Sequence, residues 1–203
     1  ANTALSNRWY AAAPYLMPLD NDPPNPAAIM DATGLKAFQL AFVLAPNGGG
    51  CSPTWGGTAA VSSDTAVKSM IDTIRAKGGD VSVSIGGYGG TKLGQACSDA
   101  ASTAAAYQQV ITKYGLHAID FDLEEPEYEN TAAVKNEIGA AKILQQNNPA
   151  CTSPSPRPAR RTAPAGSASR CCWRRSRRAS PRTTSPSCRS TAASTGLPAR
   201  RAP

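Results

Sequence analysis

Residues 118–124 read Ala-Ile-Asp-Phe-Asp-Leu-Glu, an alternation of apolar and acidic side chains. Because successive side chains of a β-strand point to opposite faces, this period of two predicts a strand with Asp120, Asp122 and Glu124 together on one face. Carboxylates this close together cannot all ionise without cost, so at least one should keep a proton near neutral pH. Such a group can donate its proton at pH 7, which is the chemistry of a general acid.

Two other interpretations of this stretch are open: a polar strand face exposed to solvent, and a set of oxygen ligands for a divalent cation. The strand is predicted to begin after Tyr114-Gly115, where the glycine ends a helix, and to stop at Glu125-Pro126. Glu124 therefore lies at the carboxyl end of the strand, where barrel and open-sheet enzymes keep their catalytic groups. This position favours catalysis.

The charged residues divide the 203-residue chain into two parts. The whole chain carries 21 basic and 14 acidic residues, a balance that suggests an acidic partner. Residues 151–203, however, hold 12 arginines and no lysine, aspartate or glutamate, whereas residues 1–150 hold nine basic and all 14 acidic residues. The first part is therefore mildly acidic, and the average describes neither part.

Residues 151–203 consist mainly of Arg, Ser, Ala, Pro and Thr, and Trp173 and Leu197 are their only large apolar side chains. Such a segment cannot bury enough apolar surface to offset its ordering entropy, so no independent domain is expected. One interpretation is a basic tail that binds RNA or another polyanion. We favour a frame error near Ala150, because a two-base shift permits the strand-like peptides LHVSVT for residues 150–156 and TPDYFSIMPFDGGFNG for residues 180–196.

Residues 1–150 alternate between strand-like and helix-like patterns. Apolar runs predict strands over Arg8–Met17, Lys36–Ala45, Asp80–Gly87 and His117–Glu124. Helical spacing of apolar residues predicts helices over Pro26–Thr33, Ser63–Lys77, Lys92–Tyr114 and Thr131–Gln146. Start and stop signals support these helices: Ser63 and Asp64, Lys77-Gly78-Gly79, and Asn130 or Thr131.

This βα alternation predicts an α/β fold with a parallel sheet and helices outside it. The four units of residues 1–150 would supply about the first half of a (β/α)8 TIM barrel, which needs roughly 250 residues. A doubly wound sheet is the structural alternative. The chain has neither a Gly-x-Gly-x-x-Gly after its first strand nor a phosphate loop to support that alternative.

Aromatic residues follow the predicted strands. Tyr15 follows the first, Trp55 lies in the glycine-rich loop after the second, and Tyr88 follows the third. Each ring alone is better explained by packing than by ligand binding. Around three aligned carboxylates they favour a sugar site, because aromatic rings suit the C–H faces of a sugar and polar groups suit its hydroxyl rim.

Two motifs in these strands resemble those of the family 18 glycoside hydrolases, specifically bacterial chitinases of the actinobacterial type. The family's third-strand pattern Ser-x-Gly-Gly is similar to Ser84-Ile85-Gly86-Gly87, and its fourth-strand pattern Asp-x-x-Asp-x-Asp-x-Glu is similar to this chain from Asp120 onward. Residues 50–57 and 78–84 also resemble that group. The resemblance covers residues 1–150, and the shifted peptide of the tail is similar to the family's sixth strand.

The resemblance implies a chitinase of the endo-β-N-acetylglucosaminidase type, which cleaves β-1,4-linked N-acetylglucosamine polymers with retention and without an enzyme nucleophile. Glu124 would act as general acid and base, Asp122 would orient the substrate's acetamido group, and Asp120 would share a proton with Asp122. No metal and no other cofactor is implied. The candidate substrate-binding residues are Tyr15, Trp55, Gly86, Gly87 and Tyr88.

The chain departs from the family's pattern in two places. His117 replaces the first Asp of the fourth-strand motif, and we expect this outer position to serve structure rather than to act as a ligand or base. The family's sixth-strand and eighth-strand residues do not exist in this reading frame. A non-catalytic sugar-binding relative, of the lectin or inhibitor kind, is therefore the alternative function, although Glu124 argues against it.

The remaining expectations concern the compartment and the partners. Cys51 and Cys97 are the cysteines of the first part, and a disulfide between them is expected for a secreted enzyme, with two buried thiols as the alternative. The start at Ala1 resembles a mature exported chain, and no apolar run is long enough to span a bilayer. We expect a secreted monomer that binds chitin or an N-acetylglucosamine oligosaccharide, with no nucleic-acid or membrane partner.

Overall fold

A mainly parallel sheet forms the frame of the protein. The computed structural model describes residues 3–20 and 22–149, together with the backbone of residues 172–176. The parallel strands lie side by side in chain order: β1 (Tyr15–Leu16), β2 (Ala37–Leu44), β5 (Asp80–Gly86), β6 (Ala118–Asp122) and β7 (Cys172–Ser176). A short hairpin of β3 (Thr54–Trp55) and β4 (Ala59–Ala60) extends the sheet beside the end of β2.

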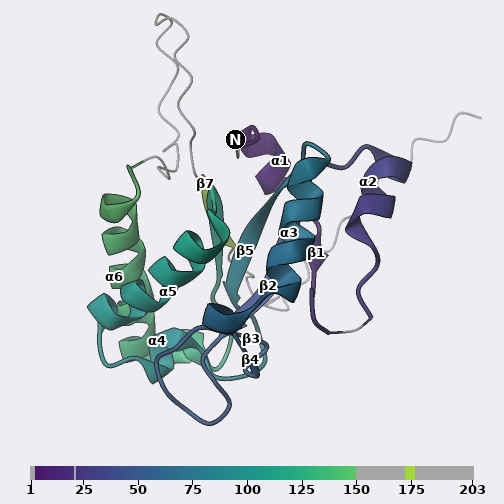
Figure 1. The fold of residues 1–203 in the computed structure, drawn as a ribbon. Helices are drawn as coiled ribbons and strands as arrows, with labels where there is room; N and C mark the ends of the chain where they lie inside the picture. The colour runs from purple at the N-terminus through teal and green to yellow at the C-terminus, as the bar shows by residue number, and fades with distance from the viewer. Residues whose placement is uncertain (1–2, 21, 150–171, 177–203) are drawn as a thin grey trace, which may run out of the picture.

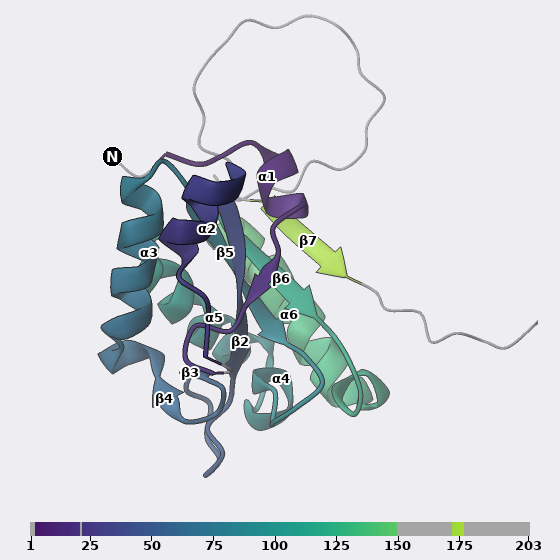
Figure 2. The same cartoon turned by 90° about the vertical axis from the view of Figure 1, so that its right-hand side faces the viewer.

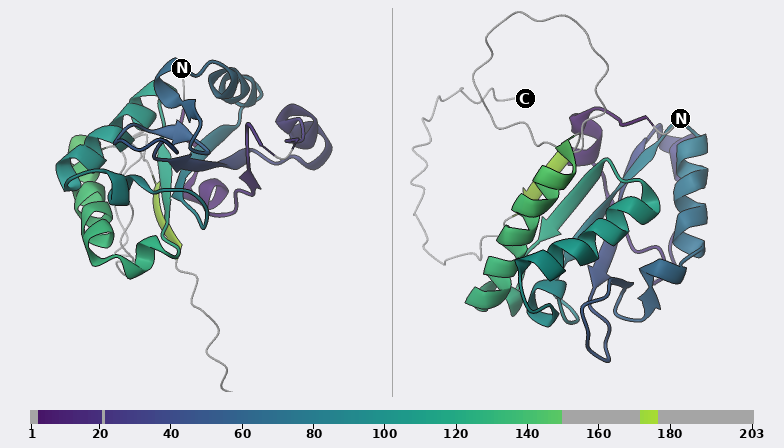
Figure 3. Two further views of the ribbon diagram at one scale, coloured as in Figure 1. Left: turned by 90° about the horizontal axis from the view of Figure 1, so that it is seen from below. Right: turned by 60° about the vertical axis from the view of Figure 1, so that its left-hand side comes forward.

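Helices cover one face of this sheet. Figures 1 and 3 show α3 (Ala66–Ala76), α5 (Ala100–Tyr114) and α6 (Thr131–Asn147) next to one another across the strands. Their apolar sides meet the strands in one core, which excludes water from the sheet face and so supplies the main drive for folding. The core includes Ile71, Ile74, Val81, Val83, Tyr107, Val110, Ile119 and Leu144.

The predicted helix signals act as expected. The Asp64 carboxylate accepts hydrogen bonds from the backbone N–H groups of Val67 and Lys68, both at 3.0 Å, at the start of α3. The Asn130 side chain caps α6 in the same way, and Gly115 ends α5 with a φ of 55°. The helix over Pro26–Thr33 is confirmed as α2. These local signals place the strands that follow each helix.

Two predicted elements are wrong. Residues 8–17 do not form one strand, because α1 (Asn7–Ala11) precedes the short β1 and the buried side chain of Tyr10 holds this helix to Asp80. The predicted helix over Lys92–Tyr114 is divided into α4 (Leu93–Ala96) and α5. Asp99 starts α5 anew by accepting a hydrogen bond from the Ser102 N–H at 2.8 Å.

The strand order distinguishes between the predicted architectures. Each new parallel strand joins the same edge of the sheet, and no reversal of strand order occurs within the described residues. This order is that of a singly wound sheet, not of the doubly wound alternative. The structure therefore shows a mixed α/β fold with a parallel sheet, whereas closure into a full TIM barrel is not seen among the described strands.

Most of the arginine-rich segment, residues 151–203, lies outside the described residues. The two interpretations of it, a polyanion-binding tail and a frame error, therefore concern residues that the structure does not describe. Residues 172–176 of this segment form β7, which pairs in parallel with β6 over Ala118–Asp122 (Figure 2). Among the described helices, none combines the length and apolar character needed to cross a membrane.

The two ends of the sheet differ in what surrounds them. In Figure 1, α1 lies at one end of the strands, and α4 and the β3–β4 hairpin lie at the opposite end. The parallel strands run from the end near α1 toward the end near α4, so their carboxyl termini lie at the end near α4 and the β3–β4 hairpin (Figure 1). The predicted site residues lie at this end.

Candidate active site

The alternation predicted for β6 is confirmed over residues 119–122. Ile119 and Phe121 belong to the core, where the Phe121 ring meets the edge of Tyr107 with ring centroids 5.7 Å apart. Asp120 and Asp122 lie on the other face and are buried, with 1% and 6% of their surface exposed. One strand therefore packs against α5 with one face and presents two carboxylates with the other.

Asp120 is the centre of a buried hydrogen-bond cluster. Its Oδ2 atom accepts hydrogen bonds from Gln39 Nε2 at 2.7 Å, from Ser84 Oγ at 3.0 Å and from the Tyr15 hydroxyl at 3.3 Å. The strand register places Ser84 directly beside Asp120. Four strands thus meet at one carboxylate, which holds it in a single orientation.

Tyr15 connects this buried cluster to solvent. Its side chain is 46% exposed, and its ring lies against Phe42 with centroids 5.7 Å apart. Burial of the hydroxyl, and then the negative charge of Asp120, raises the pKa of Tyr15 to about 12. The hydroxyl therefore keeps its proton around neutral pH and remains a hydrogen-bond donor.

Gly86 and Gly87 allow β5 to approach β6 closely. A Cβ atom on Gly86 would lie 2.3 Å from the carbonyl oxygen of Asp122, and Gly86 has a φ of 103°. The Gly87 N–H donates to that same carbonyl oxygen at 2.9 Å. The two glycines thus place the chain after β5 next to Asp122, and whether they also contact a substrate stays a prediction.

Glu124 lies two residues beyond the end of β6, because β6 ends at Asp122 and not at Glu124 as predicted. Its side chain is partly exposed, unlike the two aspartates. The carbonyl oxygen of Glu124 accepts a hydrogen bond from the Tyr128 N–H at 2.9 Å, which folds the following turn. Tyr88, which is 72% exposed, lies in the neighbouring loop after β5.

Trp55 differs from the other predicted aromatic residues. It is 2% exposed, its Nε1 donates to the Tyr114 hydroxyl at 2.8 Å, and its ring packs against that tyrosine. The ring is therefore covered by α5 and does not face solvent. Its packing explains it fully, and we leave Trp55 out of the binding surface proposed below.

Cys51 and Cys97 form a disulfide with their Cα atoms 4.8 Å apart, as predicted. The bond joins the loop after β2 to the end of α4. His117 lies at the other end of the sheet, where its Nδ1 atom is 2.8 Å from Asp80 Oδ2. This contact agrees with the structural role expected for His117.

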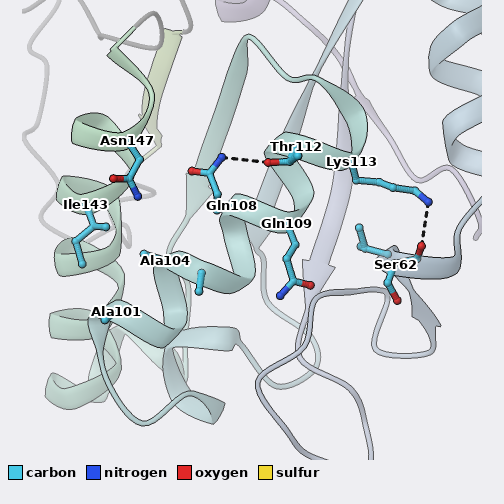
Figure 4. Close-up of a pocket in the computed structure, with 11 residues that line it drawn as sticks. Ser62, Ala101, Ala104, Gln108, Gln109, Thr112, Lys113, Ile143 and Asn147 are labelled. Carbon is cyan, nitrogen blue, oxygen red and sulfur yellow. Dashed lines mark hydrogen bonds between the residues drawn. The ribbon is translucent and has the colours of Figure 1, made fainter.

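Two further features concern metal binding and the position of a surface hollow. Among the described residues, no group of three or more His, Cys, Asp or Glu side chains could hold a metal ion. A hollow of about 640 Å³ lies elsewhere, between α5, α6 and the turn at Ser62, and Figure 4 shows Ala104, Gln108, Lys113 and Ile143 around it. None of the predicted site residues lines this hollow.

Sequence reasoning missed part of the site. Gln39 and Phe42 were not among the candidates, and Ser84 was noted only as part of a motif. Gln39 gave one usable signal, since it is the single polar residue in the otherwise apolar stretch of β2. Which carboxylate it would contact depends on the pairing of strands far apart in the sequence, and no local pattern gives that.

Comparison with known sequences identifies chitinases. A probable bifunctional chitinase/lysozyme of Escherichia coli (strain K12) is 32% identical over 133 residues, which are 66% of this chain and 15% of that protein. Endochitinase 11 of Metarhizium anisopliae is 29% identical over 133 residues, which are 66% of this chain and 25% of that protein. The chain thus spans a quarter or less of the length of these curated relatives. No protein-family model matches it.

Comparison with solved structures gives the same result. The catalytic domain of a hyperthermophilic chitinase from Pyrococcus furiosus has a TM-score of 0.56 and 27% identity, covering 68% of this chain and 43% of that one. Catalytic-site mutants of the thermostable chitinase of that organism, complexed with chito-oligosaccharides, have a TM-score of 0.54 and 25% identity, covering 68% and 42%. The chain is therefore homologous to chitinases over about two thirds of its length. Its assignment to the actinobacterial type stays a prediction.

Proposed function

We propose that this chain is a chitinase-like glycosidase that cleaves β-1,4-linked N-acetylglucosamine polymers with Glu124 as general acid and base. The observation that carries the proposal is the arrangement around β6. Two buried carboxylates, Asp120 and Asp122, lie on one strand face, and a partly exposed glutamate follows them at the carboxyl end of a parallel sheet. The homology to chitinases gives the substrate class.

Asp120, Asp122 and Glu124 form a row of acids, of which the two aspartates are buried. Glu124 can exchange protons with a substrate because it lies at the boundary between these buried aspartates and solvent. In the proposed reaction, its carboxyl group gives a proton to the glycosidic oxygen. At the same time, the acetamido oxygen of the sugar that carries the scissile bond attacks the anomeric carbon of that same sugar. The bond between this carbon and the glycosidic oxygen breaks, and the leaving sugar departs as an alcohol. Glu124 then takes a proton from the water that attacks the same carbon. The bond between this carbon and the acetamido oxygen breaks, which regenerates the acetamido group and returns the enzyme to its starting state.

The two aspartates have supporting roles in this proposal. Asp122 orients the acetamido group so that its oxygen points at the anomeric carbon. Asp120, fixed by Gln39, Ser84 and Tyr15, shares a proton with Asp122 and allows the charge of Asp122 to change during the cycle. The hydrogen bonds on Asp120 hold its carboxylate in place.

The exposed aromatic rings supply the proposed contacts to the sugar. Tyr15 lies at the row itself, and Tyr88 extends from the loop after β5. Rings at such positions can cover the C–H face of a sugar while the polar rim of the sugar meets the carboxylates. Tyr15, Tyr88, Gly86 and Gly87 therefore remain the proposed binding residues.

A second candidate is sugar binding without turnover. It is favoured by the exposed rings of Tyr15 and Tyr88, which could contact a sugar whether or not a bond is cleaved. Binding would persist in this case, because the acid row and the exposed tyrosines are present.

The test is hydrolysis of chito-oligosaccharides, followed by chromatography, together with binding measured by titration calorimetry. Glu124→Gln should reduce the hydrolysis rate by about 10²- to 10⁴-fold, the contribution of a positioned general acid, while the dissociation constant stays close to that of the parent. Glu125→Gln is the matched control, since Glu125 is the adjacent glutamate and is exposed.

Each outcome of this test is informative. Hydrolysis by the parent and by Glu125→Gln but not by Glu124→Gln supports the proposal. Binding without hydrolysis by the parent supports the second candidate. Undiminished hydrolysis by Glu124→Gln removes the role of Glu124, and the absence of both binding and hydrolysis in the parent overturns both functions.

The proposal extends to the compartment and to the arginine-rich segment. Secretion is consistent with the Cys51–Cys97 disulfide, because such bonds persist in oxidising compartments. We further propose that residues 151–203 are not an independent domain and reflect a frame error. Sequencing the gene across the codons for Ala150 and Cys151 tests this directly.

A further inference from the structure

A buried lysine lies beneath the loop that follows β5. Lys92 is 0% exposed, although lysine is among the residues least often buried. Its Nζ atom donates to the carbonyl oxygens of Tyr88 at 2.9 Å, Gly89 at 3.0 Å and Gly90 at 3.0 Å. An ammonium group has three N–H donors and a neutral amine has two, so three acceptors at these distances fit the charged form.

Lys92 thereby gathers the loop of residues 87–91 around one point. The two ends of this loop are also held, since the Gly87 N–H donates to the carbonyl oxygen of Asp122 and the Thr91 carbonyl accepts from the Ala45 N–H, both at 2.9 Å. Tyr88 is presented by this loop, with its side chain in solvent and its carbonyl oxygen on the ammonium group. The lysine thus holds the backbone that carries a proposed sugar-binding residue.

Two buried glutamates accompany the lysine. Glu127 lies in the turn after Glu124 and is 0% exposed, and Glu137 lies on α6 and is 1% exposed. The Oε1 atom of Glu137 accepts from the Tyr107 hydroxyl at 2.5 Å and from the Gly94 N–H at 2.9 Å. Among the described residues, no group donates a hydrogen bond to the Oε2 atom of Glu137 or to either side-chain oxygen of Glu127.

One proton between the two glutamates resolves this shortage of donors. Two buried carboxylates would repel each other and leave acceptor oxygens unsatisfied, which is costly in a medium of low polarity. A protonated carboxyl group can donate to its neighbour instead. Burial, and then the charge of Glu137, raises the pKa of Glu127 to about 9, and burial also raises the pKa of Glu137.

The charges then balance. A glutamate pair that shares one proton carries a single negative charge, which matches the single positive charge of Lys92. Burial lowers the pKa of Lys92, and the charges of Glu127 and Glu124 act in the opposite direction. The charge of Glu124, the proposed general acid, therefore also favours the charged form of Lys92.

We propose that Lys92 is a positioning residue: its buried ammonium group, balanced by one negative charge shared between Glu127 and Glu137, fixes the loop of residues 87–91 beside the turn that carries Glu124. The relevance of this arrangement to catalysis rests on the proposed function. The arrangement itself can be tested without any substrate.

The first test measures how the buried charges affect the unfolding equilibrium of the full chain in urea. Glu127→Gln supplies an amide donor in place of the shared proton, so its unfolding equilibrium constant should stay within about tenfold of the parent. Glu127→Gln combined with Glu137→Gln removes the buried counter-charge of Lys92 and should raise that constant by about a hundredfold or more. Adding Lys92→Met to this double variant removes the isolated charge and should restore most of the loss.

The second test follows the loop by hydrogen exchange of the backbone amides. In the triple variant, residues 87–91 should exchange about tenfold faster or more than in the parent, because their carbonyl groups have lost the ammonium group that holds them. Lys68→Met is the matched control, since Lys68 pairs with Asp72 at the surface and should leave the loop unchanged.

The outcomes separate clearly. Recovery of stability in the triple variant together with fast exchange of the loop supports the proposal, and a double variant that does not fold while the triple variant does leads to the same conclusion. If Glu127→Gln alone raises the unfolding equilibrium constant as much as the double change does, the proposal of a shared negative charge is wrong. A triple variant without recovered stability, or with slow loop exchange, overturns the role of Lys92. These readouts do not depend on sugar binding, so failure of the proposed function would be recognised separately.

Discussion

The amino and carboxyl ends of the parallel strands each bury an aspartate, and they hold it with different partners. At the amino end, Asp80 Oδ2 accepts from the Tyr10 hydroxyl at 2.5 Å and lies 2.8 Å from His117 Nδ1, while Oδ1 accepts from Arg75 Nε at 2.8 Å. Arg75 also donates to the carbonyl oxygens of Tyr114 and Gly115. This end joins α1, α3, α5 and β6 to the start of β5.

At the carboxyl end, Asp120 accepts hydrogen bonds from neutral groups of three neighbouring strands, namely Gln39, Ser84 and Tyr15. Exposed Tyr88 and partly exposed Glu124 lie around it. A buried aspartate can therefore serve either end of such a sheet. Arg75 and Tyr10 from two helices, together with His117, tie elements together around Asp80. Gln39, Ser84 and Tyr15, by contrast, are neutral donors on strands that orient Asp120 toward a proposed reaction site.

The largest effect should come from removing each aspartate's charge in turn. Asp80→Asn breaks a buried network with Arg75 and should lower the free energy of unfolding by about 3–5 kcal/mol. Asp120→Asn keeps one acceptor oxygen for its neutral donors and should cost about 1–3 kcal/mol. Urea unfolding of both variants measures the difference. Equal losses would show that the two ends are not distinguished as described.

A smaller effect should separate the two tyrosines. Tyr10 is 3% exposed and its hydroxyl also accepts from the Leu5 N–H at 3.1 Å, so Tyr10→Phe leaves buried groups unsatisfied and should cost about 1–3 kcal/mol. Tyr15 is 46% exposed and its bond to Asp120 is 3.3 Å long. Tyr15→Phe should therefore cost less than about 1 kcal/mol while weakening chito-oligosaccharide binding. The reverse order of stabilities would contradict this prediction.

The smallest effect is the dependence of stability on acid pH. Burial alone would raise the pKa of Asp80, but hydrogen bonds from His117 and Tyr10 and the charge of Arg75 bring it below its ordinary value. A carboxyl group whose pKa is lowered by folding adds stability above its unfolded pKa of about 3.9, and this stability is lost as the pH falls through the folded value.

Asp80 should therefore add a slope of at most about 1.4 kcal/mol per pH unit to the free energy of unfolding below about pH 4. Urea unfolding of the parent and of Asp80→Asn between pH 5 and pH 2 measures this slope. The variant should lack this part of the slope, and parallel curves for the two proteins would refute the assignment to Asp80.

Much of the fold could be predicted because its signals are local. The alternation of β6 depends only on the two-residue period of a strand, and Asp64, Asn130 and Gly115 act on backbone groups within a few residues. The failed prediction at residues 8–17 has the opposite cause. The helix there is held by Tyr10 through a contact with Asp80, 70 residues away in the sequence.

The candidate site divides in the same way. Asp120, Asp122 and Glu124 could be found from their spacing, whereas Gln39 and Phe42 could not, because strand pairing alone brings β2 into place. Trp55 shows the converse, since it was predicted to bind substrate and its ring is covered by α5. The partners of Lys92 likewise come from three separate segments of the chain.

By itself, the sequence determined the βα order of residues 1–150 and the row of acids on the fourth predicted strand, since both follow from periodicity and short-range sterics. Three features follow from the packing of distant segments instead: the donors around Asp120, the burial of Trp55, and the burial of Lys92, Glu127 and Glu137 in the same structure. The physical reason is that hydrogen bonds, burial and charge balance at these positions depend on the packing of residues that lie far apart along the chain.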